Sequence, residues 1–309
     1  MIYIIIWRKI SEKGYILKEK KTGFVALIGR PSSGKSTLLN KLCGYKASIV
    51  SKHPQTTRFL VKGIYNDDSS QIIFIDSPGF HNFNSNLNRG LSNLAVRNTE
   101  NADVILYVVD TTREFGREEE DIINKIKPLE RITIVVLNKI DLENSDMEIK
   151  NRVLEKLAPV GVVEFSALKG KNPDKIINLI KKNLQIGPMY FPEDYVTDQS
   201  IPFRITEVVR EKIFQLTKEE VPHSCYAEVE ELKVNEDKIE ARCAVFVENE
   251  SQKGIIIGSK GSMIKMIGVK ARYDLENIFE RRVNLFLNVK VHKDWRKKDE
   301  FLKKMFDIS

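Results

Sequence analysis

The sequence predicts an α/β domain with a mostly parallel sheet covered by helices, followed by a smaller α+β domain. Three observations carry this prediction. Between residues 23 and 186, short apolar runs rich in β-branched residues alternate with helical stretches. A glycine-rich loop connects the first of these runs to a helix. From Ile201 onward the predicted order changes to helix, strand, strand, helix, strand, helix, so a second kind of domain begins there.

Five apolar runs are predicted as strands of the first domain, because each is short and bounded by polar or glycine residues. They span residues 24–29, 71–76, 104–110, 132–138 and 162–167. Helices are expected over residues 36–42, 118–126 and 173–184. Strands separated by helices form right-handed crossovers and a parallel sheet, whose ligands bind at the carboxyl ends of the strands. We therefore expect the functional residues of this domain at those ends.

The chain of 309 residues is long enough for two domains, and its patterns divide it into four parts. We expect an N-terminal extension over residues 1–22, a first domain over 23–186, a linker over 187–200 and a second domain over 201–309. The extension is interpreted as an ill-ordered segment or an extra edge strand. Its six basic residues leave a membrane-surface contact as the alternative.

Composition excludes several classes of protein. With 42% hydrophobic and 30% charged residues, the chain is expected to be soluble and globular, and no segment is apolar over the length of a transmembrane helix. Three widely spaced cysteines form no metal-ligand pattern, which is typical of reduced thiols in a cytoplasmic protein. The net charge of +7 is compatible with an acidic partner such as nucleic acid or anionic lipid.

The loop G-R-P-S-S-G-K-S-T, residues 29–37, has the spacing of a phosphate-binding loop between a strand and a helix. In such a loop, backbone N–H groups and the helix start surround the β-phosphate. Lys35 is expected to bridge β- and γ-phosphate oxygens, and Ser36 to ligate Mg²⁺. A glycine-rich turn that fits the spacing by chance is the alternative, and the motifs that follow argue against it.

Two motifs predict that the base is guanine. In N-K-I-D, residues 138–141, Asp141 can accept hydrogen bonds from guanine N1 and the 2-amino group, which adenine does not offer in that arrangement. Asn138 is expected to contact the N7 edge and to tie the loops together. In S-A-L, residues 166–168, the Ala167 N–H is expected near guanine O6. The predicted ligands are therefore GTP and GDP, with Mg²⁺.

Two segments are predicted to sense the γ-phosphate. Asp76, at the start of D-S-P-G, can hold Mg²⁺ through water, and Gly79 can offer its N–H to the γ-phosphate. In H-P-Q-T-T-R, Thr57 is the expected Mg²⁺ ligand, with Thr56 left open as the alternative. Phe80 stands where many regulatory GTPases carry a glutamine that orients water. Turnover is therefore expected to be slow, or to depend on a group supplied from elsewhere.

The predicted nucleotide site combines these motifs. Its contacts are expected from Gly29, Arg30, Pro31, Ser32, Ser33, Gly34, Lys35, Ser36, Thr37, Asp76, Ser77, Pro78, Gly79, Asn138, Lys139, Asp141, Ser166, Ala167 and Leu168. The catalytic residues are predicted to be Lys35, Thr57 and Gly79, and the Mg²⁺ ligands Ser36, Thr57 and Asp76. Asp110 and Arg113 are expected to close a turn rather than to contact nucleotide.

The second domain carries a G-x-x-G turn at residues 258–261, predicted to lie between an apolar strand end and a helix. Such a turn brings N–H groups and a lysine against the backbone of about four single-stranded nucleotides. Residues 253–304 hold fourteen basic and six acidic side chains, whereas residues 201–252 hold seven and twelve. This local charge and the order of elements favour RNA binding over a simple turn.

The predicted RNA site extends on both sides of this turn. Its residues are expected to be Ile257, Gly258, Ser259, Lys260, Gly261, Lys265, Lys270 and Arg272, with further attraction from Lys253, Arg281 and Arg282. A groove for unstacked bases is expected between Ile255, Ile257, Ile264 and Ile267.

On these motifs the chain resembles the Era family, bacterial ribosome-assembly GTPases with a C-terminal KH domain. The resemblance runs from about Lys21 to Phe306, through G-R-P-S-S-G-K-S-T-L-L-N-K-L, P-Q-T-T-R, D-S-P-G-F-H, L-N-K-I-D, S-A-L-K-G, E-V-V-R-E-K-I-F and I-I-I-G-S-K-G. It implies a P-loop GTPase domain followed by a type II KH domain that grips a single-stranded segment near the 3′ end of small-subunit (16S) ribosomal RNA. It also implies a monomeric, cytoplasmic protein that acts with the 30S subunit in its maturation, and in which GTP and RNA binding support one another.

The chain departs from the family at Ser32-Ser33, where the family commonly has Asn-Val. In related GTPases that asparagine helps to ligate a K⁺ ion bridging the phosphates. Serine is shorter and offers a hydroxyl in place of an amide carbonyl. We therefore expect K⁺ stimulation to be weakened, or to rely on backbone carbonyls around Thr56.

Two alternatives to an RNA-dependent switch remain at this point. A membrane-surface-associated regulatory GTPase, in peripheral contact with the cytoplasmic face of the inner membrane, would use the basic N-terminus and Arg281-Arg282. A protein with a degenerate GTPase half would only bind RNA, and the intact residues Lys35, Asp76 and Asp141 argue against that.

Overall fold

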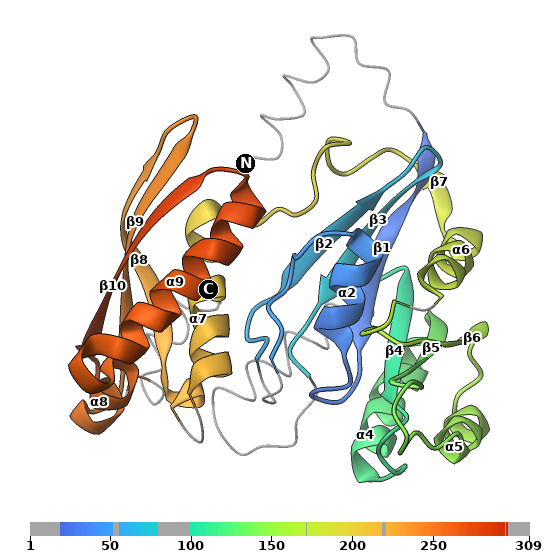
Figure 1. Ribbon diagram of the computed structural model, residues 1–309. Helices are drawn as coiled ribbons and strands as arrows, with labels where there is room; N and C mark the ends of the chain where they lie inside the picture. The colour runs from blue at the N-terminus through green and yellow to red at the C-terminus, as the bar shows by residue number, and fades with distance from the viewer. Residues whose placement is uncertain are drawn as a thin grey trace.

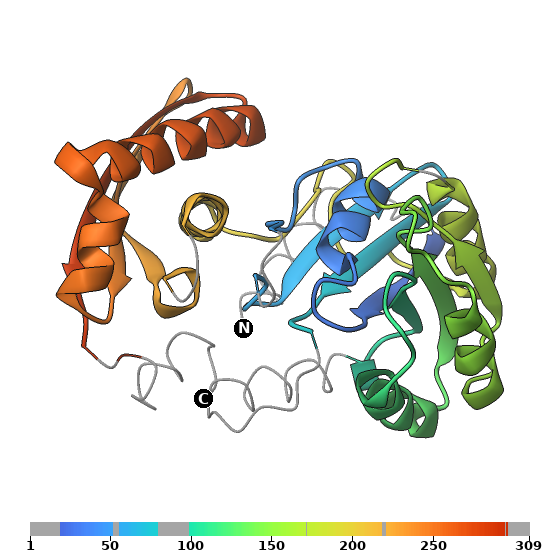
Figure 2. The same ribbon diagram turned by 60° about the horizontal axis from the view of Figure 1, so that its bottom comes forward.

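The computed structural model describes residues 19–51, 56–79, 99–170, 172–217, 221–293 and 295 (Figure 1). Two domains lie side by side. The strands of the second domain lie on its outer side, and its helices α7 (Ile201–Leu216) and α9 (Ser262–Phe279) are turned toward the first domain (Figures 1 and 2). No helix within these ranges combines the length and the apolar character that crossing a membrane requires.

In the described part of the first domain, seven strands form one sheet in the order β2-β3-β1-β4-β5-β6, with β7 paired to β1. They are β1 (Lys20–Ile28), β2 (Val61–Asn66), β3 (Ser70–Asp76), β4 (Val104–Asp110), β5 (Ile132–Asn138), β6 (Gly161–Glu164) and β7 (Gln185–Gly187). Strands β1, β3, β4, β5 and β6 run parallel, whereas β2 and β7 are antiparallel to their neighbours. The predicted mostly parallel sheet is confirmed.

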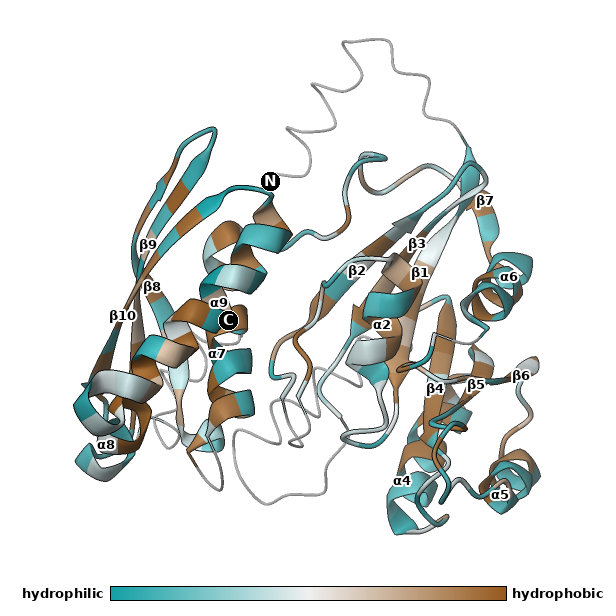
Figure 3. Ribbon diagram, in the orientation of Figure 1, coloured by the Kyte–Doolittle hydropathy of each residue, from teal (hydrophilic) through white to brown (hydrophobic). Residues whose placement is uncertain are grey.

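Helices cover both faces of this sheet, because its central strands are apolar on both faces (Figure 3). Along β4, Leu106 and Val108 belong to one buried cluster with α2 (Lys35–Cys43) and α6 (Pro173–Asn183). The alternate residue Tyr107 belongs to a second cluster with α4 (Arg117–Ile126) and α5 (Glu148–Lys156). The carboxyl ends of the parallel strands therefore stay uncovered between these layers, where the polar motifs lie.

The predicted elements match the structure unevenly. The strands expected over residues 104–110 and 132–138 have those bounds. The strand expected over 162–167 ends at Glu164, because the chain then turns out of the sheet to form the S-A-L loop. Strand β2 was not predicted. Its apolar pattern is interrupted by Gly63. A Cβ added at Gly63 would lie 2.7 Å from Cys43 Sγ, so the close approach of α2 requires a glycine there.

The second domain is an α+β unit with a three-stranded sheet, as predicted. Its described elements are α7, β8 (Tyr226–Val234), β9 (Lys238–Val247), α8 (Glu250–Ile257), α9 and β10 (Arg282–Val291), with short 3₁₀ turns η2 (Pro222–Ser224) and η3 (Ser259–Gly261). The sheet order is β10-β9-β8, with β10 parallel and β8 antiparallel to β9. The last helix expected from the sequence falls outside the described residues.

The prediction of a strand immediately before the G-x-x-G turn is wrong. Residues Glu250–Ile257 form helix α8, in spite of three consecutive isoleucines that favour a strand. The Asn249 side chain caps this helix by accepting a hydrogen bond from the Gln252 N–H, and Gly258 ends it. The cap and the tertiary packing of Ile256 therefore outweigh local β-propensity, and the turn lies between two helices.

Candidate functional site

The phosphate-binding loop connects β1 to α2, and two of its glycines are required by their surroundings. Gly29 has φ 155° and Gly34 has φ 98°. A Cβ at Gly29 would lie 2.3 Å from the Val108 carbonyl oxygen, and one at Gly34 would lie 2.2 Å from Asn138 Nδ2. No side chain fits at either distance, so the loop packs directly against the ends of β4 and β5.

Lys35 is buried at the first position of α2, with its ammonium group inside the loop. Its Nζ donates hydrogen bonds to the carbonyl oxygens of Gly29 at 3.0 Å and Arg30 at 2.8 Å. Burial lowers the pKa of Lys35 to about 8, against opposing contributions from Asp76 and Glu119. The ammonium group is thus held at the centre of the loop, where it would contact the phosphate groups of a bound nucleotide.

Three oxygen-bearing side chains gather at the mouth of the loop. Ser36 Oγ lies 2.5 Å from Asp76 Oδ2 and 3.0 Å from Thr57 Oγ1. Asp76 is fully buried, and its Oδ1 has no hydrogen-bond partner among the described residues. Burial raises the pKa of this carboxyl. Two hydroxyls and a carboxylate with a spare oxygen form the hard, oxygen-only donor set that suits Mg²⁺.

The two threonines of the P-Q-T-T-R segment have different surroundings. Thr57 is the one whose hydroxyl reaches Ser36. The Thr56 hydroxyl instead lies 2.6 Å from Ser51 Oγ, and the Thr56 carbonyl accepts a hydrogen bond from Arg210 of α7. The structure therefore places Thr57 beside Ser36 and turns Thr56 away from it.

Ser48 belongs to this cluster, and the sequence did not indicate it. Its Oγ donates to Asp76 Oδ2 at 2.8 Å. The Asn40 side chain fixes Ser48 by bonding both its N–H and its carbonyl oxygen. Ser48 lies outside the motifs of the predicted nucleotide site, so only the path of the loop after α2 brings it to the carboxylate.

On the base side, Asn138 ties three loops together. Its Nδ2 donates to the Ser33 carbonyl at 2.8 Å, and its Oδ1 accepts the Ala167 N–H at 2.9 Å. One Nδ2 hydrogen remains for a base edge. The phosphate loop, the N-K-I-D turn and the S-A-L turn are thereby fixed relative to one another, as expected from the sequence.

Asp110 has a second role that the sequence did not reveal. Its Oδ1 accepts the Thr112 N–H and hydroxyl and so closes the predicted turn. Its Oδ2 accepts a 2.6 Å hydrogen bond from Lys139 Nζ. Lys139 has φ 68°, an uncommon backbone conformation for a non-glycine residue. The buried carboxylate therefore fixes the direction of the lysine stem beside the base position.

A cleft of about 330 Å³ opens at these residues. Its lining combines predicted positions with the unpredicted segment 49–51: Pro31, Ser32, Gly34, Lys35, Ser36, Thr37, Ile49, Val50, Ser51, Thr56, Thr57, Ser77, Gly79 and Lys139.

Several predicted contact residues do not line this cleft with their side chains. The Arg30 side chain is buried beneath the loop, where its Nε lies 3.0 Å from Glu119 Oε1. Ser33 is fully buried, and Leu168 is 76% exposed to solvent. Arg30 and Ser33 can therefore serve a nucleotide only through their backbone. Phe80 lies outside the described residues.

The G-x-x-G turn has a backbone that only its glycines accept. Gly258 has φ 72° and ψ 175°, and an added Cβ would lie 2.8 Å from the Met263 backbone nitrogen. Gly261, at φ 78°, precedes the first residue of α9. Between them, Ser259 and Lys260 are exposed. The turn thus presents a lysine and the start of a helix to solvent.

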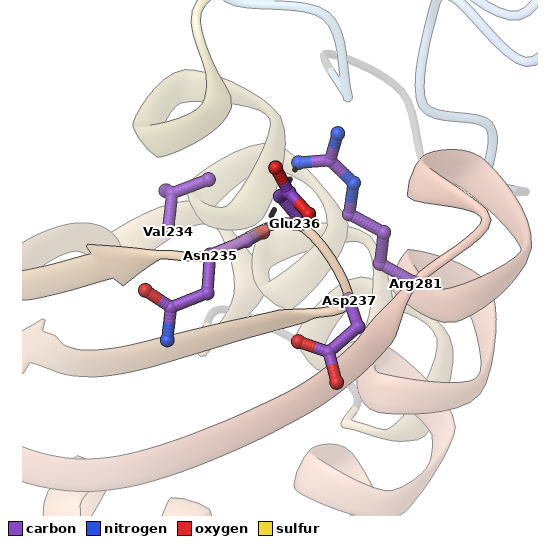
Figure 4. Close-up of a pocket in the computed structure, with 5 residues that line it drawn as sticks. All are labelled: Val234, Asn235, Glu236, Asp237 and Arg281. Atoms are coloured by element: carbon purple, nitrogen blue, oxygen red, sulfur yellow. Dashed lines mark hydrogen bonds between the residues drawn. The ribbon is translucent and has the colours of Figure 1, made fainter.

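The predicted groove residue Ile267 is wrong, and Arg281 lies far from the turn. Ile267 is fully buried in the core of the domain and does not line a groove, whereas Ile255 is 46% exposed. Arg281 Nη1 donates to the Asn235 carbonyl at the tip of the β8–β9 hairpin (Figure 4). The 18 residues of α9, about 27 Å of helix, separate Arg281 from the turn. Lys265, Lys270 and Arg272 remain exposed on α9 itself.

Comparisons with known proteins agree with both domains. A family model described as a 50S ribosome-binding GTPase matches residues 24–139, and a KH domain model matches residues 220–296. GTPase Era of Borreliella burgdorferi (strain ZS7) is 44% identical over 289 residues, which cover 93% of this chain and all of that protein. The chain belongs to the Era family of GTPases. GTPase Era of Treponema denticola is 43% identical over 290 residues, 92% of this chain and 99% of that protein.

Solved structures of Era share the whole arrangement. A point variant of Aquifex aeolicus Era bound to GDP·AlF₄⁻ superposes with a TM-score of 0.87 at 40% identity, covering 93% of this chain and 98% of that one. A structure of Era in complex with MgGDPNP and nucleotides 1506–1542 of 16S ribosomal RNA has the same TM-score, identity and coverage. The likeness therefore includes both domains and their linkage.

Proposed function

We propose that the protein is a slow GTP-hydrolysing switch whose KH domain binds a single-stranded segment near the 3′ end of small-subunit ribosomal RNA during assembly of the 30S subunit. The observation that carries this is the presence, in one chain, of the Ser36–Thr57–Asp76 cluster and an exposed G-x-x-G turn. The complex of a similar Era with 16S ribosomal RNA and MgGDPNP supports the pairing of these two ligands.

In this proposal, the chain's own groups hold the phosphates and the cation. Lys35 contacts the β- and γ-phosphate oxygens, and the Gly79 N–H donates to the γ-phosphate. Ser36 and Thr57 would ligate Mg²⁺, and Asp76 would hold it through water; the ion would neutralise charge on the phosphate oxygens. Positioning by these groups is the proposed source of catalysis, since among the described residues none of the side chains lining the cleft is a carboxylate or histidine that could act as a base.

The interface between the domains gives the two ligands a physical connection. Asp274 lies on α9, the helix that begins directly after the G-x-x-G turn. It forms ion pairs with Lys46 of the first domain at 2.7 Å and with Lys212 of α7 at 2.5 Å. Lys46 lies in the loop that leads to Ser48 and the nucleotide cleft. RNA binding that shifts α9 would therefore shift the loop beside the nucleotide cleft. Nucleotide binding that shifts this loop would in turn shift α9.

A binding experiment tests the proposed function. The probe is a labelled RNA with the sequence of nucleotides 1506–1542 of 16S ribosomal RNA, titrated with protein loaded with GDPNP or with GDP. We expect the dissociation constant to be at least tenfold lower with GDPNP, because both ligands favour one domain arrangement. The control is the complementary RNA strand, which carries the same charge. Equal affinity for the two strands would reduce the second domain to a non-specific polyanion binder and contradict the proposal.

The potassium requirement is a separate prediction. Ser32 has φ 61°, a conformation that asparagine adopts more readily than serine. We expect wild-type turnover to differ by less than about twofold between K⁺ and Na⁺ buffers. Ser32→Asn should gain a several-fold preference for K⁺, because its carbonyl restores an ion ligand. Turnover is measured by phosphate release at matched ionic strength, with Ser32→Ala as the control. Strong K⁺ stimulation of the wild type would show that Ser32 or backbone carbonyls already suffice.

We place the protein in the cytoplasm, and we do not propose a membrane role for its described surface. The Arg281-Arg282 pair was one basis of the membrane alternative, and the Arg281 guanidinium is directed to the β8–β9 hairpin (Figure 4). The basic N-terminal segment, the other basis of that alternative, falls outside the described residues.

A further inference from the structure

Helix α7 of the second domain contacts the loop of the first domain that carries the γ-phosphate-sensing threonine. Arg204 donates to the carbonyl oxygens of Lys46 and Ala47. About two turns further along, Glu211 accepts the Val50 N–H at 2.8 Å and pairs with Lys46 Nζ at 2.6 Å. The backbone on the approach to the cleft is therefore held by side chains of a helix that belongs to the other domain.

The loop is anchored again immediately after Thr57. Arg58 is only 4% exposed and its guanidinium lies within the second domain, about 6 Å from the ring centroids of Phe214 and Trp295. The same guanidinium donates to backbone carbonyl oxygens of Pro222 and His223 in η2 and of Cys225 just after it. A residue adjacent to Thr57 is thus part of the core of the neighbouring domain.

Arg210 supplies the anchor on the other side of Thr57. Its Nη2 donates to the Thr56 carbonyl oxygen at 2.7 Å, and Nη1 pairs with Glu207 one turn earlier on α7. Arg210 and Glu207 are 2% and 3% exposed. Thr57 therefore lies between the Thr56 carbonyl, which Arg210 holds, and Arg58, whose side chain is anchored in the second domain. Its hydroxyl is directed to Ser36.

The charge of this anchor distinguishes it from ordinary interface packing. Removing an arginine and a glutamate from water costs several kcal/mol per ion, and apolar residues of similar volume would pack an interface at least as well. Glu207 keeps one oxygen without a hydrogen-bond partner among the described residues, and its pKa is raised by burial. What the guanidinium adds, and what an apolar side chain lacks, is a donor directed at the Thr56 carbonyl.

We propose that Arg210 is a positioning residue for GTP hydrolysis, acting from the RNA-binding domain. Through the Thr56 carbonyl it sets the backbone that aims the Thr57 hydroxyl at the Mg²⁺ position beside Ser36 and Asp76. The inference rests on the proposed role of Thr57 as a ligand of the ion. The position of the KH domain would then affect GTP hydrolysis through one hydrogen bond, from Arg210 to the segment that carries Thr57.

The test compares steady-state turnover and Mg²⁺ titrations of wild type, Arg210→Lys and the double variant Glu207→Gln with Arg210→Met. The double variant removes the guanidinium without leaving a buried unpaired carboxylate, so it keeps the interface foldable. We expect it to lower kcat at least tenfold and to raise the half-saturating Mg²⁺ concentration at least fivefold. The dissociation constant for GDP should stay within about twofold, since γ-phosphate and ion contacts order this loop only in the triphosphate state. Arg210→Lys, which retains a donor, should recover part of the loss.

Arg204→Met is the matched control. Arg204 is also a buried arginine of α7 that donates to carbonyls of the first domain, but at Lys46 and Ala47 rather than beside Thr57. The Arg204→Met variant should lose stability with a smaller shift in Mg²⁺ requirement than the Arg210 variants, and an equal shift would assign the effect to general loosening of the interface. Thr57→Ala separates the two proposals. If it abolishes the Mg²⁺ response while the Arg210 variants behave as wild type, only the positioning role is overturned. If Thr57→Ala is itself without effect, the proposed assignment of Thr57 fails as well.

Discussion

Gly258→Asp is expected to weaken binding of the 16S-derived RNA at least a hundredfold while leaving GDP affinity within twofold of wild type. Two physical effects act together. At φ 72° and ψ 175° the backbone is in a region that only glycine occupies freely, and a Cβ would lie 2.8 Å from the Met263 nitrogen and 2.7 Å from its Cβ. The turn must therefore change shape, and the new carboxylate would repel the RNA phosphates that the turn is proposed to bind. A hundredfold change corresponds to about 2.7 kcal/mol.

Gly254→Asp is the matched control for charge alone. Gly254 lies one turn earlier on α8, and nothing lies within 4 Å of a Cβ added there. It introduces the same carboxylate near the same RNA without strain in the turn, so we expect a loss of only a few-fold that diminishes at higher salt. RNA affinity is measured by fluorescence anisotropy and GDP affinity by calorimetry on the same preparations. Equal losses from both substitutions would show that the turn geometry is irrelevant to binding.

The residues whose location could be predicted from the sequence are those that lie directly at the end of a strand, because the strand ends determine where they lie in the fold. Asn138 and Asp76 end strands of a parallel sheet, and such ends meet at one edge whatever the loops do. The same logic brought Lys35 and Ser36 to that edge, because they open the helix after the first strand. The order of the motifs was therefore enough to predict one site from segments far apart in the chain.

The residues that the sequence missed depend on how loops and domains pack, which periodicity does not encode. Ser48 reaches Asp76 through the path of the loop after α2. Arg210 reads in the sequence as one charged residue of a helix, and only the docking of α7 on the first domain directs it to Thr56. The Ile255–Ile257 run was interpreted as a strand because its β-propensity is strong. The Asn249 cap and the burial of Ile256 instead stabilise a helix.

The second large effect is expected at the base. Asp141→Asn should weaken GTP binding by a hundredfold or more and make the protein bind and hydrolyse xanthosine triphosphate. A carboxylate accepts both the guanine N1–H and the 2-amino group, and each hydrogen bond to a charged group contributes about 1.5–3 kcal/mol. Asparagine accepts one of these donors, and its own NH₂ opposes the other. Xanthine has a carbonyl oxygen at position 2, which accepts a hydrogen bond from that NH₂. Competition between the two triphosphates for labelled GDP measures the change.

Asp110→Asn provides the comparison that separates base recognition from damage to the loop. Asp110 lies at the same sheet edge and pairs with Lys139 at 2.6 Å, but it faces the lysine stem and the turn rather than the base edge. Its loss should therefore weaken both triphosphates by similar factors, because Lys139 is released without altering the pattern of donors and acceptors at the base. A gain of xanthosine triphosphate binding restricted to Asp141→Asn identifies that carboxylate as the group that reads guanine. If Asp141→Asn instead weakens both nucleotides equally, the residue supports the loop and guanine is selected by the backbone of the S-A-L turn.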